Sequence, residues 1–431
     1  MTKRESELIE LLHKEVKPAL GCTEPIAVAL AAAKATELVR AAGCAGSVCG
    51  LDVEVSGNIL KNGMGVGIPG TGMVGLQIAA ALGSVCGKSE YGLEVLKDLT
   101  EHDVAEAKAM VKDRKISIAA PENVKLLYVK VSVQAGDHNA WAVIEDDHDR
   151  IVETGVDGKA TDCRNCTGTD EAPIKETKDY NLTVKEIYSF AQSVDYEDIR
   201  FILGDRDLNL ALAREGLEGD YGLGVGKAIR ENQKYIFGDD FLSYAMGMTA
   251  AASDARMAGC TLPAMSNSGS GNQGITVSMP VIAYALKYGV DDESLARALI
   301  LSNLVAIHIK GYLGKLSALC GCVIASTGSA CGLILLQKGS YEQICAAIKN
   351  MIGNITGMVC DGAKVGCAMK VASGVSCAIQ SCVLAMRGTC VQATDGIIDE
   401  DIEKTIRNLG EIGSLGMKST DRMIQHIMLC K

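Results

Sequence analysis

Apolar residues recur with a helical period near the start of the chain and again throughout its second half. Residues 5–16 and 25–42 have this period, and Pro18 and Gly43 follow them as stop signals. From residue 181 onward the period is almost exclusively helical, which predicts an all-helical C-terminal domain over residues 181–431. The expected helices are 183–194, 197–203, 207–216, 222–236, 240–258, 276–288, 292–310, 322–337, 341–353, 364–386 and 399–409.

Between these regions, apolar and polar residues alternate as they do in strands. The expected strands are 51–56, 124–134, 139–145 and 150–154, with helices near 73–83 and 103–112. This order predicts an α+β domain over 45–156 with a mostly antiparallel sheet. The polar residues 157–180 indicate a linker, and residues 1–44 indicate a helical hairpin that packs on the C-terminal domain.

Composition limits the class of protein. The 431 residues are 48% hydrophobic but only 4% aromatic, so the core must be built mainly from aliphatic side chains. The net charge of −11 and the lack of a Lys/Arg cluster disfavour nucleic acid or an anionic membrane as partners. No secretory signal pattern opens the chain, and 17 cysteines are best kept as free thiols in a reducing compartment, so we expect a cytoplasmic protein.

Three cysteines stand beside glycines in small-residue surroundings: Cys322, Cys360 and Cys367. Thiolates are the usual ligands of iron–sulfur clusters, and glycine lets the backbone approach such a bulky group. Buried core cysteine is the common alternative, but Asp361 and Lys364 lie between the last two and are poor core residues. We therefore take these three as candidate cluster ligands, and interpret Cys320, Cys331, Cys377, Cys382 and Cys390 as core residues.

A polar, glycine-rich segment, residues 266–274, lies directly between two apolar helical stretches. Backbone N–H groups at a glycine-rich helix N-terminus bind anions, so the segment is a candidate site for a carboxylate or a phosphate. Its alternative interpretation is an ordinary solvated loop.

The sequence Gly21-Cys22-Thr23-Glu24-Pro25 precedes the second predicted helix, with Pro25 suited to the first helical position. A helix N-terminus favours a thiolate at Cys22, which would serve as cluster ligand, nucleophile or proton acceptor. A simple helix cap at Thr23 or Glu24 is the competing interpretation.

Several further residues are minor candidates. They are His308, Lys310, Lys315 and Lys364 as catalytic or charge-neutralising groups, the Cys163/Cys166 pair as a zinc motif, and the penultimate Cys430 as a mobile cap on an open iron. For each of them an ordinary core, surface or terminal role is the more common explanation.

These motifs together resemble the L-cysteine desulfidase family, a relative of the iron–sulfur L-serine dehydratases. The matching segments are residues 17–25, 56–58, 67–70, 266–274, 321–322 and 360–367. The dehydratase resemblance implies that Cys322, Cys360 and Cys367 hold a [4Fe-4S] cluster with one open iron. Where the dehydratases carry a serine-rich substrate motif, this chain has Gly21-Cys22-Thr23-Glu24, which leaves serine as the substrate open.

The resemblance implies a lyase of amino-acid catabolism that converts L-cysteine into pyruvate, ammonia and sulfide, with L-serine as the alternative substrate, and a homodimer. We assign Cys22 and Glu24 to catalysis, with Cys22 as base or cluster ligand. Substrate binding is assigned to Thr23, Ser266, Asn267, Ser268, Gly269, Ser270, Gly271, Asn272 and Gln273.

Two other classes stay open. One is a pyridoxal-phosphate lyase that uses residues 268–272 as a phosphate cup, and the other is a non-catalytic protein that senses cysteine or redox state.

Overall fold

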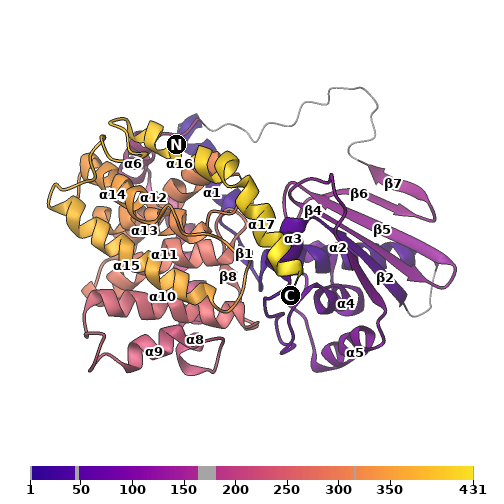
Figure 1. Cartoon of the computed structure of the whole chain (residues 1–431). Coiled ribbons are helices and arrows are strands. Elements are labelled where there is room, and N and C mark those ends of the chain that lie inside the picture. The colour runs from indigo at the N-terminus through magenta and orange to yellow at the C-terminus, as the bar shows by residue number, and fades with distance from the viewer. Residues whose placement is uncertain (1, 44–47, 164–180, 315–316, 431) are drawn as a thin grey trace.

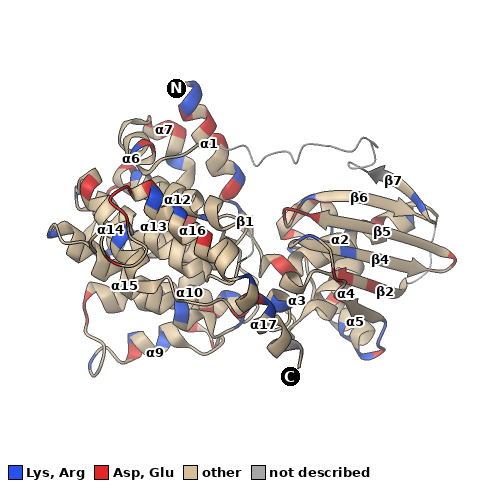
Figure 2. Cartoon of the chain, turned by 45° about the horizontal axis from the view of Figure 1, so that its top comes forward, with Lys and Arg blue, Asp and Glu red and all other residues tan. Residues whose placement is uncertain are grey.

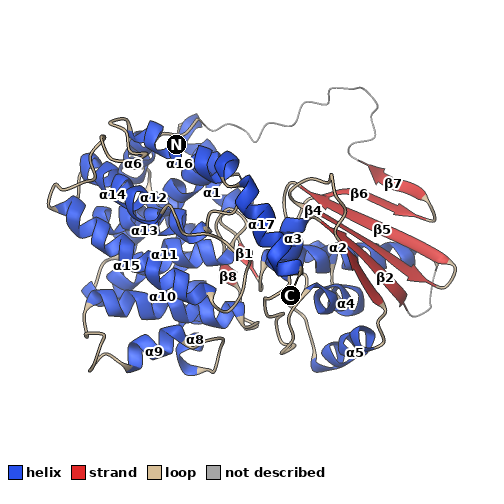
Figure 3. Ribbon diagram, viewed as in Figure 1, coloured by secondary structure: helices blue, strands red, loops and turns tan. Residues whose placement is uncertain are grey.

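The chain folds into two adjacent bodies (Figures 1 and 3). The computed structural model describes residues 2–43, 48–163, 181–314 and 317–430. One body contains a six-stranded sheet with helices, and the other is almost entirely helical. The predicted fold class, an α+β region followed by an all-helical one, is confirmed.

The sheet has the strand order β3-β2-β4-β5-β6-β7. All neighbours pair antiparallel except β2 and β3, which are parallel. The strands are β2 (Val48–Val55), β3 (Ile116–Ala119), β4 (Tyr128–Ala135), β5 (His138–Glu145), β6 (Ile151–Val156) and β7 (Lys159–Cys163). Strands β3 and β7 were not predicted, and β7 occupies the start of the expected linker, whose residues 164–180 lie outside the described residues.

Four helices of the described residues belong to the sheet body. They are α2 (Thr23–Ala41), α3 (Gly57–Gly63), α4 (Leu76–Cys86) and α5 (Glu101–Lys112), with a 3₁₀ segment at Ser89–Glu94. Of these, α2, α3 and α4 contact the sheet and α5 packs on α4. A β-carbon at Gly83 would collide with the carbonyl of Ala29, so α2 and α4 approach each other at backbone distance. Helix α3 lies in a stretch that was expected to be a glycine-rich loop, and Ser56 caps it by accepting from the Ile59 N–H at 3.3 Å.

The helical body contains the remaining helices. They are α1 (Lys3–Glu15), α6 (Val184–Ser193), α7 (Tyr196–Ile199), α8 (Gly204–Glu218), α9 (Val225–Glu231), α10 (Phe241–Met257), α11 (Gly271–Tyr288), α12 (Asp292–Leu313), α13 (Gly321–Leu336), α14 (Tyr341–Ile355), α15 (Cys367–Met386), α16 (Ile402–Glu411) and α17 (Lys418–Leu429), with short 3₁₀ and π segments at Arg200–Leu203 and Ile412–Gly416. Helix α17 was not predicted. It lies against α3 at the junction of the two bodies (Figure 1).

The first two helices belong to different bodies. Leu8, Leu11 and Leu12 of α1 join the core of the helical body, as expected. In contrast, Ile26 and Leu30 of α2 join the core of the sheet body, so the predicted hairpin packing on the helical domain is corrected for α2. The hairpin is split because α2 is alanine-rich and buried on nearly every side, which suits the space between the sheet and α4. The chain therefore crosses between the bodies at residues 16–22.

One described helix, α15, is long and apolar enough to cross a membrane by length and composition alone. It packs against α10, α13 and α14 and supplies Ala378, Cys382 and Ala385 to the helical core. Core helices of folded domains pass the same test of length and composition. Charged residues of both signs are dispersed over the surface seen in Figure 2.

Candidate functional site

A short antiparallel pairing joins the residues before α2 to the residues before α11. Strand β1 (Pro18–Ala19) pairs with β8 (Ala264–Met265). Beyond it, the N–H and Oγ of Ser266 both donate to the Lys17 carbonyl, at 2.8 and 2.6 Å, and the Ser268 N–H donates to the Glu15 carbonyl at 2.9 Å. The two motifs predicted separately at 21–25 and 266–274 are thus neighbours in space.

The N-terminus of α2 carries a buried thiol–carboxylate pair. Cys22 is the N-cap residue, and its Sγ donates to Glu24 Oε2 at 3.0 Å. Asn62 Nδ2 of α3 donates to the other oxygen, Oε1, at 3.0 Å. Thr23 Oγ1 donates to the Gly269 carbonyl at 2.7 Å and so ties this turn to the glycine-rich segment. Pro25 occupies the third helical position, two residues later than predicted.

The two members of the pair titrate in opposite directions. Burial raises the pKa of Cys22 well above its ordinary value, and the negative charge of Glu24 raises it further. Burial also opposes ionisation of Glu24, but the charges of His148 and Arg256 and the hydrogen bond from Cys22 outweigh it and lower the Glu24 pKa. The helix N-terminus had suggested a thiolate at Cys22; its surroundings instead favour a thiol beside an ionised Glu24.

Three residues of this site were missed in the sequence: Asn62, His148 and Arg256. His148 lies between β5 and β6 and is 4% exposed, and a β-carbon at Gly269 would lie 3.1 Å from its Nδ1. Arg256, at the end of α10, is 2% exposed and donates through Nη1 to Asn272 Oδ1 at 3.2 Å. The sheet body and the helical body therefore both contribute to one buried polar site.

The side chains of segment 266–274 are used mostly to build the segment itself. Ser266 and Ser268 donate to Lys17 and Asn267, and Ser270 caps α11 by accepting from the Gln273 N–H at 3.4 Å. Helix α11 begins at Gly271, earlier than predicted, so Gly271, Asn272 and Gln273 form its first turn. The assignment of Ser266–Gln273 to substrate binding stays a prediction. Because the serine side chains bond within the segment, a ligand would be bound mainly by the backbone of the first turn of α11.

A buried chain of hydrogen bonds connects this segment to α12 and α8. Gln273 Nε2 donates to Asn267 Oδ1 at 2.7 Å, and Asn267 Nδ2 donates to Asn303 Oδ1 at 2.8 Å. Asn303 Nδ2 then donates to Asp205 Oδ2 at 2.9 Å. Burial raises the pKa of Asp205 to about 7. The chain ends near Gly321, whose β-carbon would lie 3.2 Å from Gln273 Oε1, and so connects the segment to the start of α13.

Replacing Asp205 with asparagine is expected to remove a pH dependence of stability. A carboxyl group whose folded pKa exceeds its unfolded pKa binds protons better in the folded state, so the free energy of unfolding falls as pH rises from about 4 to about 7. The total fall is about 4 kcal/mol at most. Urea unfolding at about pH 5 and about pH 8 should show a lower free energy of unfolding for wild type at the higher pH, and little change for Asp205→Asn. Asp207→Asn, at an exposed position of α8, is the control; equal slopes for wild type and Asp205→Asn would contradict the expectation.

The candidate cluster ligands come from two adjacent segments. The Cys320 N–H donates to the Met358 carbonyl at 3.0 Å, and the Cys360 N–H donates to the Ala318 carbonyl at 2.7 Å. Cys322 lies in the first turn of α13, and Cys367 is the first residue of α15. A β-carbon at Gly374 would collide with the Cys322 Sγ, so glycine at this position makes room for the sulfur.

The thiols of Cys320, Cys322, Cys360 and Cys367 lie close enough to affect one another's titration. Burial raises the pKa of Cys320, and charges at the other three would raise it further. Burial likewise raises the pKa of Cys322 to about 12, with a contribution from Cys367. Cys320, interpreted from the sequence as a core residue, therefore belongs to this thiol group. Among the described residues, no three His, Cys, Asp or Glu side chains are spaced to hold a metal ion.

The thiol group adjoins the Cys22–Glu24 pair. Cys22 packs in one small apolar cluster with Val66 and Met257, and Cys367 and Val365 pack against that cluster. A bridge between Gly65 and Lys364 holds the two segments together. The Cys22–Glu24 turn and the segment that carries Cys367 thus meet at the junction of the two bodies.

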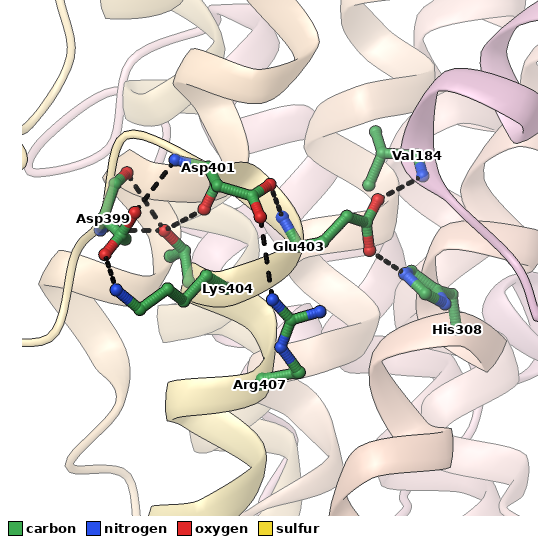
Figure 4. Close-up of polar contacts among 8 residues, drawn as sticks. Val184, His308, Asp399, Asp401, Glu403, Lys404 and Arg407 are labelled. Carbon is green, nitrogen blue, oxygen red and sulfur yellow. Dashed lines mark hydrogen bonds and ion pairs between the residues drawn. The ribbon is translucent and has the colours of Figure 1, made fainter.

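Of the minor candidates, His308 lies away from this junction. His308 of α12 pairs with Glu403 at 2.7 Å, and Glu403 accepts from the Val184 N–H at 2.7 Å (Figure 4), so His308 joins α12 to α16. Lys364 forms an ion pair with Asp361. Lys315 and Cys166 lie outside the described residues.

Cys430 is exposed at the end of α17, 3.8 Å from His426 Nε2. Helix α17 is held on α3 by the buried Lys61–Asp421 ion pair at 2.5 Å. Its Met428 would lie 3.4 Å from a β-carbon at Gly362, so this helix contacts the segment that carries Cys360 and Cys367. The role of Cys430 as an iron cap stays a prediction.

The fold and site define a two-body protein with a thiol group and an ionised carboxylate enclosed between a helical body and a sheet body. The family model for the serine dehydratase alpha chain matches residues 90–426, and the chain belongs to that family. The match extends from the helical body into the sheet body. Membership indicates a lyase of the serine dehydratase type.

The chain is also similar to several curated proteins over its full length. It is 48% identical to a UPF0597 protein of Bacteroides fragilis, covering 100% of both chains. It is 48% identical to a UPF0597 protein of Oleidesulfovibrio alaskensis, over 99% of this chain and 98% of the relative. It is 49% identical to a UPF0597 protein of Parabacteroides distasonis, over the same shares.

Proposed function

We propose that this protein catalyses β-elimination on a small L-amino acid, with L-cysteine as the preferred substrate and pyruvate, ammonia and sulfide as products. The observation that carries the proposal is that the buried, ionised Glu24 and its partner Cys22 lie in the apolar cluster against which Cys367 packs, and that Cys367 belongs to the thiol group. L-Serine, which would release water in place of sulfide, is the second candidate substrate, and the family assignment favours it.

The thiol group suits an iron–sulfur cluster in its donor chemistry. Thiolates are the ligands such clusters require, and Gly374 makes room for the Cys322 sulfur. Cys322, Cys360 and Cys367 would hold the cluster, with Cys320 beside them. When bound through three thiolates, a [4Fe-4S] cluster supplies one open iron as a Lewis acid for the leaving group of the substrate.

Glu24 is the group we assign to remove the α-proton. It is ionised in a buried place, and its two oxygens are positioned by Asn62 and by Cys22. When Glu24 takes the proton, the C–H electron pair forms the double bond between Cα and Cβ, and hydrosulfide leaves with the electrons of the C–S bond. The released 2-aminoacrylate tautomerises to an imine, which water hydrolyses to pyruvate and ammonia. The Cys22 thiol donates to Glu24 and keeps it a carboxylate between turnovers.

Replacing Cys22 with alanine is expected to lower turnover about 10- to 100-fold while iron and sulfide contents stay at the wild-type level. The reason is that a hydrogen bond to a charged group contributes about 1.5–3 kcal/mol, and its loss raises the Glu24 pKa. Cys22→Ser keeps a donor and should recover part of the activity. Cys86→Ala, a half-buried cysteine of α4, is the control. Loss of iron in Cys22→Ala alone would make Cys22 a ligand and contradict this assignment.

The proposed reaction is tested with anaerobically purified, iron- and sulfide-reconstituted protein. Incubation with L-cysteine should give equal amounts of pyruvate and sulfide, and L-serine should give pyruvate at a lower rate. Faster turnover of L-serine would make the protein a serine dehydratase. Binding of either amino acid without pyruvate would leave a sensing protein, and activity that needs added pyridoxal phosphate would overturn the cluster mechanism.

A further inference from the structure

Arg256 is a buried guanidinium with two of its three nitrogens unused in hydrogen bonding among the described residues. Its side chain is 2% exposed, and Nη1 donates to Asn272 Oδ1 at 3.2 Å. Nε and Nη2 are buried and have no hydrogen-bond partner among the described residues. A charged donor left unsatisfied in a protein interior is costly, so these two N–H groups indicate a ligand that the site is built to receive.

The unsatisfied pair of N–H groups lies beside the first turn of α11. A β-carbon at Gly271 would collide with Nε, and would also approach Nη2 to 2.8 Å. The guanidinium therefore packs against the Gly271 backbone, where only glycine leaves room for it. Helix α11 has 18 residues, so its N-terminus adds a positive partial charge beside the guanidinium.

Arg256 acts on the same site as the catalytic pair. The positive charge of Arg256 contributes to the lowered pKa of Glu24, and it offsets part of the rise in the pKa of Cys22. Arg256 is therefore within electrostatic reach of both groups. No carboxylate of the described residues forms an ion pair with Arg256, although its neighbour Glu24 is ionised. A bound anion would therefore be the negatively charged partner of the guanidinium.

Nε and Nη2 form one edge of the guanidinium, and two parallel N–H groups on one edge match the two oxygens of a carboxylate. We propose that Arg256 binds the α-carboxylate of the amino-acid substrate through Nε and Nη2, beside the N-terminus of α11. This assignment rests on the proposed β-elimination and deepens it. It makes Arg256 the residue that selects α-amino acids over amines lacking a carboxylate, and it directs the α-carbon of the substrate toward Glu24.

The test compares binding of L-serine and L-cysteine with binding of ethanolamine and cysteamine, which lack the carboxylate. Titration calorimetry on anaerobic holoprotein gives the dissociation constants of wild type, Arg256→Gln and Arg256→Lys. We expect Arg256→Gln to weaken amino-acid binding at least about 30-fold and to leave amine binding unchanged. Arg256→Lys, which keeps the charge but loses the fork, should fall between the two.

Two further variants keep the result interpretable. Gly271→Ala keeps Arg256 in the chain, but the new β-carbon would displace its guanidinium, so this variant should also weaken amino-acid binding selectively. Arg230→Gln removes a guanidinium that stacks over Tyr244, and should leave binding as in wild type.

The outcomes separate this assignment from the proposed function. Equal affinity of wild type and Arg256→Gln for L-serine and L-cysteine overturns the assignment, even if both proteins release pyruvate. If Arg256→Gln selectively loses affinity for amino acids but wild type releases no pyruvate, the carboxylate site is supported and the proposed lyase activity is overturned. Equal weakening of amines and amino acids by Arg256→Gln shows a structural role and overturns the assignment.

Discussion

Replacing Cys322 with alanine is expected to remove most of the iron and sulfide from anaerobically reconstituted protein and to lower turnover at least about 100-fold. Changes to groups that only orient a metal ligand typically cost about 10- to 100-fold in affinity or activity, so loss of a ligand should cost more. Cys322 lies in the first turn of α13, where a sulfur fits against Gly374. Iron and sulfide analysis with an absorption spectrum in the cluster region measures the effect directly.

The same helix provides a matched control. Cys331 is also fully buried on α13, but it belongs to the main helical core away from the thiol group. Cys331→Ala should keep iron, sulfide and turnover near wild type and lose only a little stability. Equal iron content in the Cys322→Ala and Cys331→Ala proteins would remove Cys322 from the ligand set.

Replacing Glu24 with glutamine is expected to lower turnover by about 10²–10⁴-fold while iron content and fold are retained. A positioned general base contributes this much to proton transfer from carbon. The amide keeps the size of the side chain, and it can still accept from Asn62 or Cys22, but it cannot take up a proton. Pyruvate release under saturating substrate is the measurement.

Glu37, a more exposed carboxylate farther along α2, provides the control, because it accepts from the Ser89 N–H at 2.7 Å and lies away from the site. Glu37→Gln should be fully active. A Glu24→Gln protein with wild-type turnover would show that another group removes the α-proton. Because the Glu24 pKa is lowered, the activity of wild type should not decline on the acid side until pH falls below the ordinary carboxyl range, near about 4.

The periodic pattern of the chain predicted most of the fold because the helices are long and amphipathic or buried, with clear stop signals. Helix α3 was missed because its glycines and asparagines have weak helix propensity, and it is stabilised by the Ser56 cap and by packing. Helix α17 was also missed. Its docking on α3 depends on the Lys61–Asp421 ion pair, a contact between distant residues that local periodicity does not predict. The location of α2 in the sheet body also depends on contacts between distant residues.

The sequence motifs identified Cys22, Glu24 and the cysteine-bearing segments, and the structure brings them together. It did not identify Asn62, His148 or Arg256, because their relation to Glu24 is created only by the docking of the two bodies. One signal was present: Asp254 and Arg256 are the only charged residues between 241 and 257, in an otherwise small and apolar helix. Burying the charges of Asp254 and Arg256 in such a helix is costly, and costly buried charges often mark functional sites. An analysis of hydrophobic periodicity alone does not take this cost into account.

The crossing of the chain at residues 16–22 has a mechanical consequence. Glu24 and Cys22 are carried by the sheet body, whereas Arg256 and the thiol group are carried by the helical body. The distance between the proposed base and the proposed carboxylate anchor is therefore set by the docking of the two bodies, which the β1–β8 pairing joins. A substitution that shifts one body against the other would disturb both proposed roles at once.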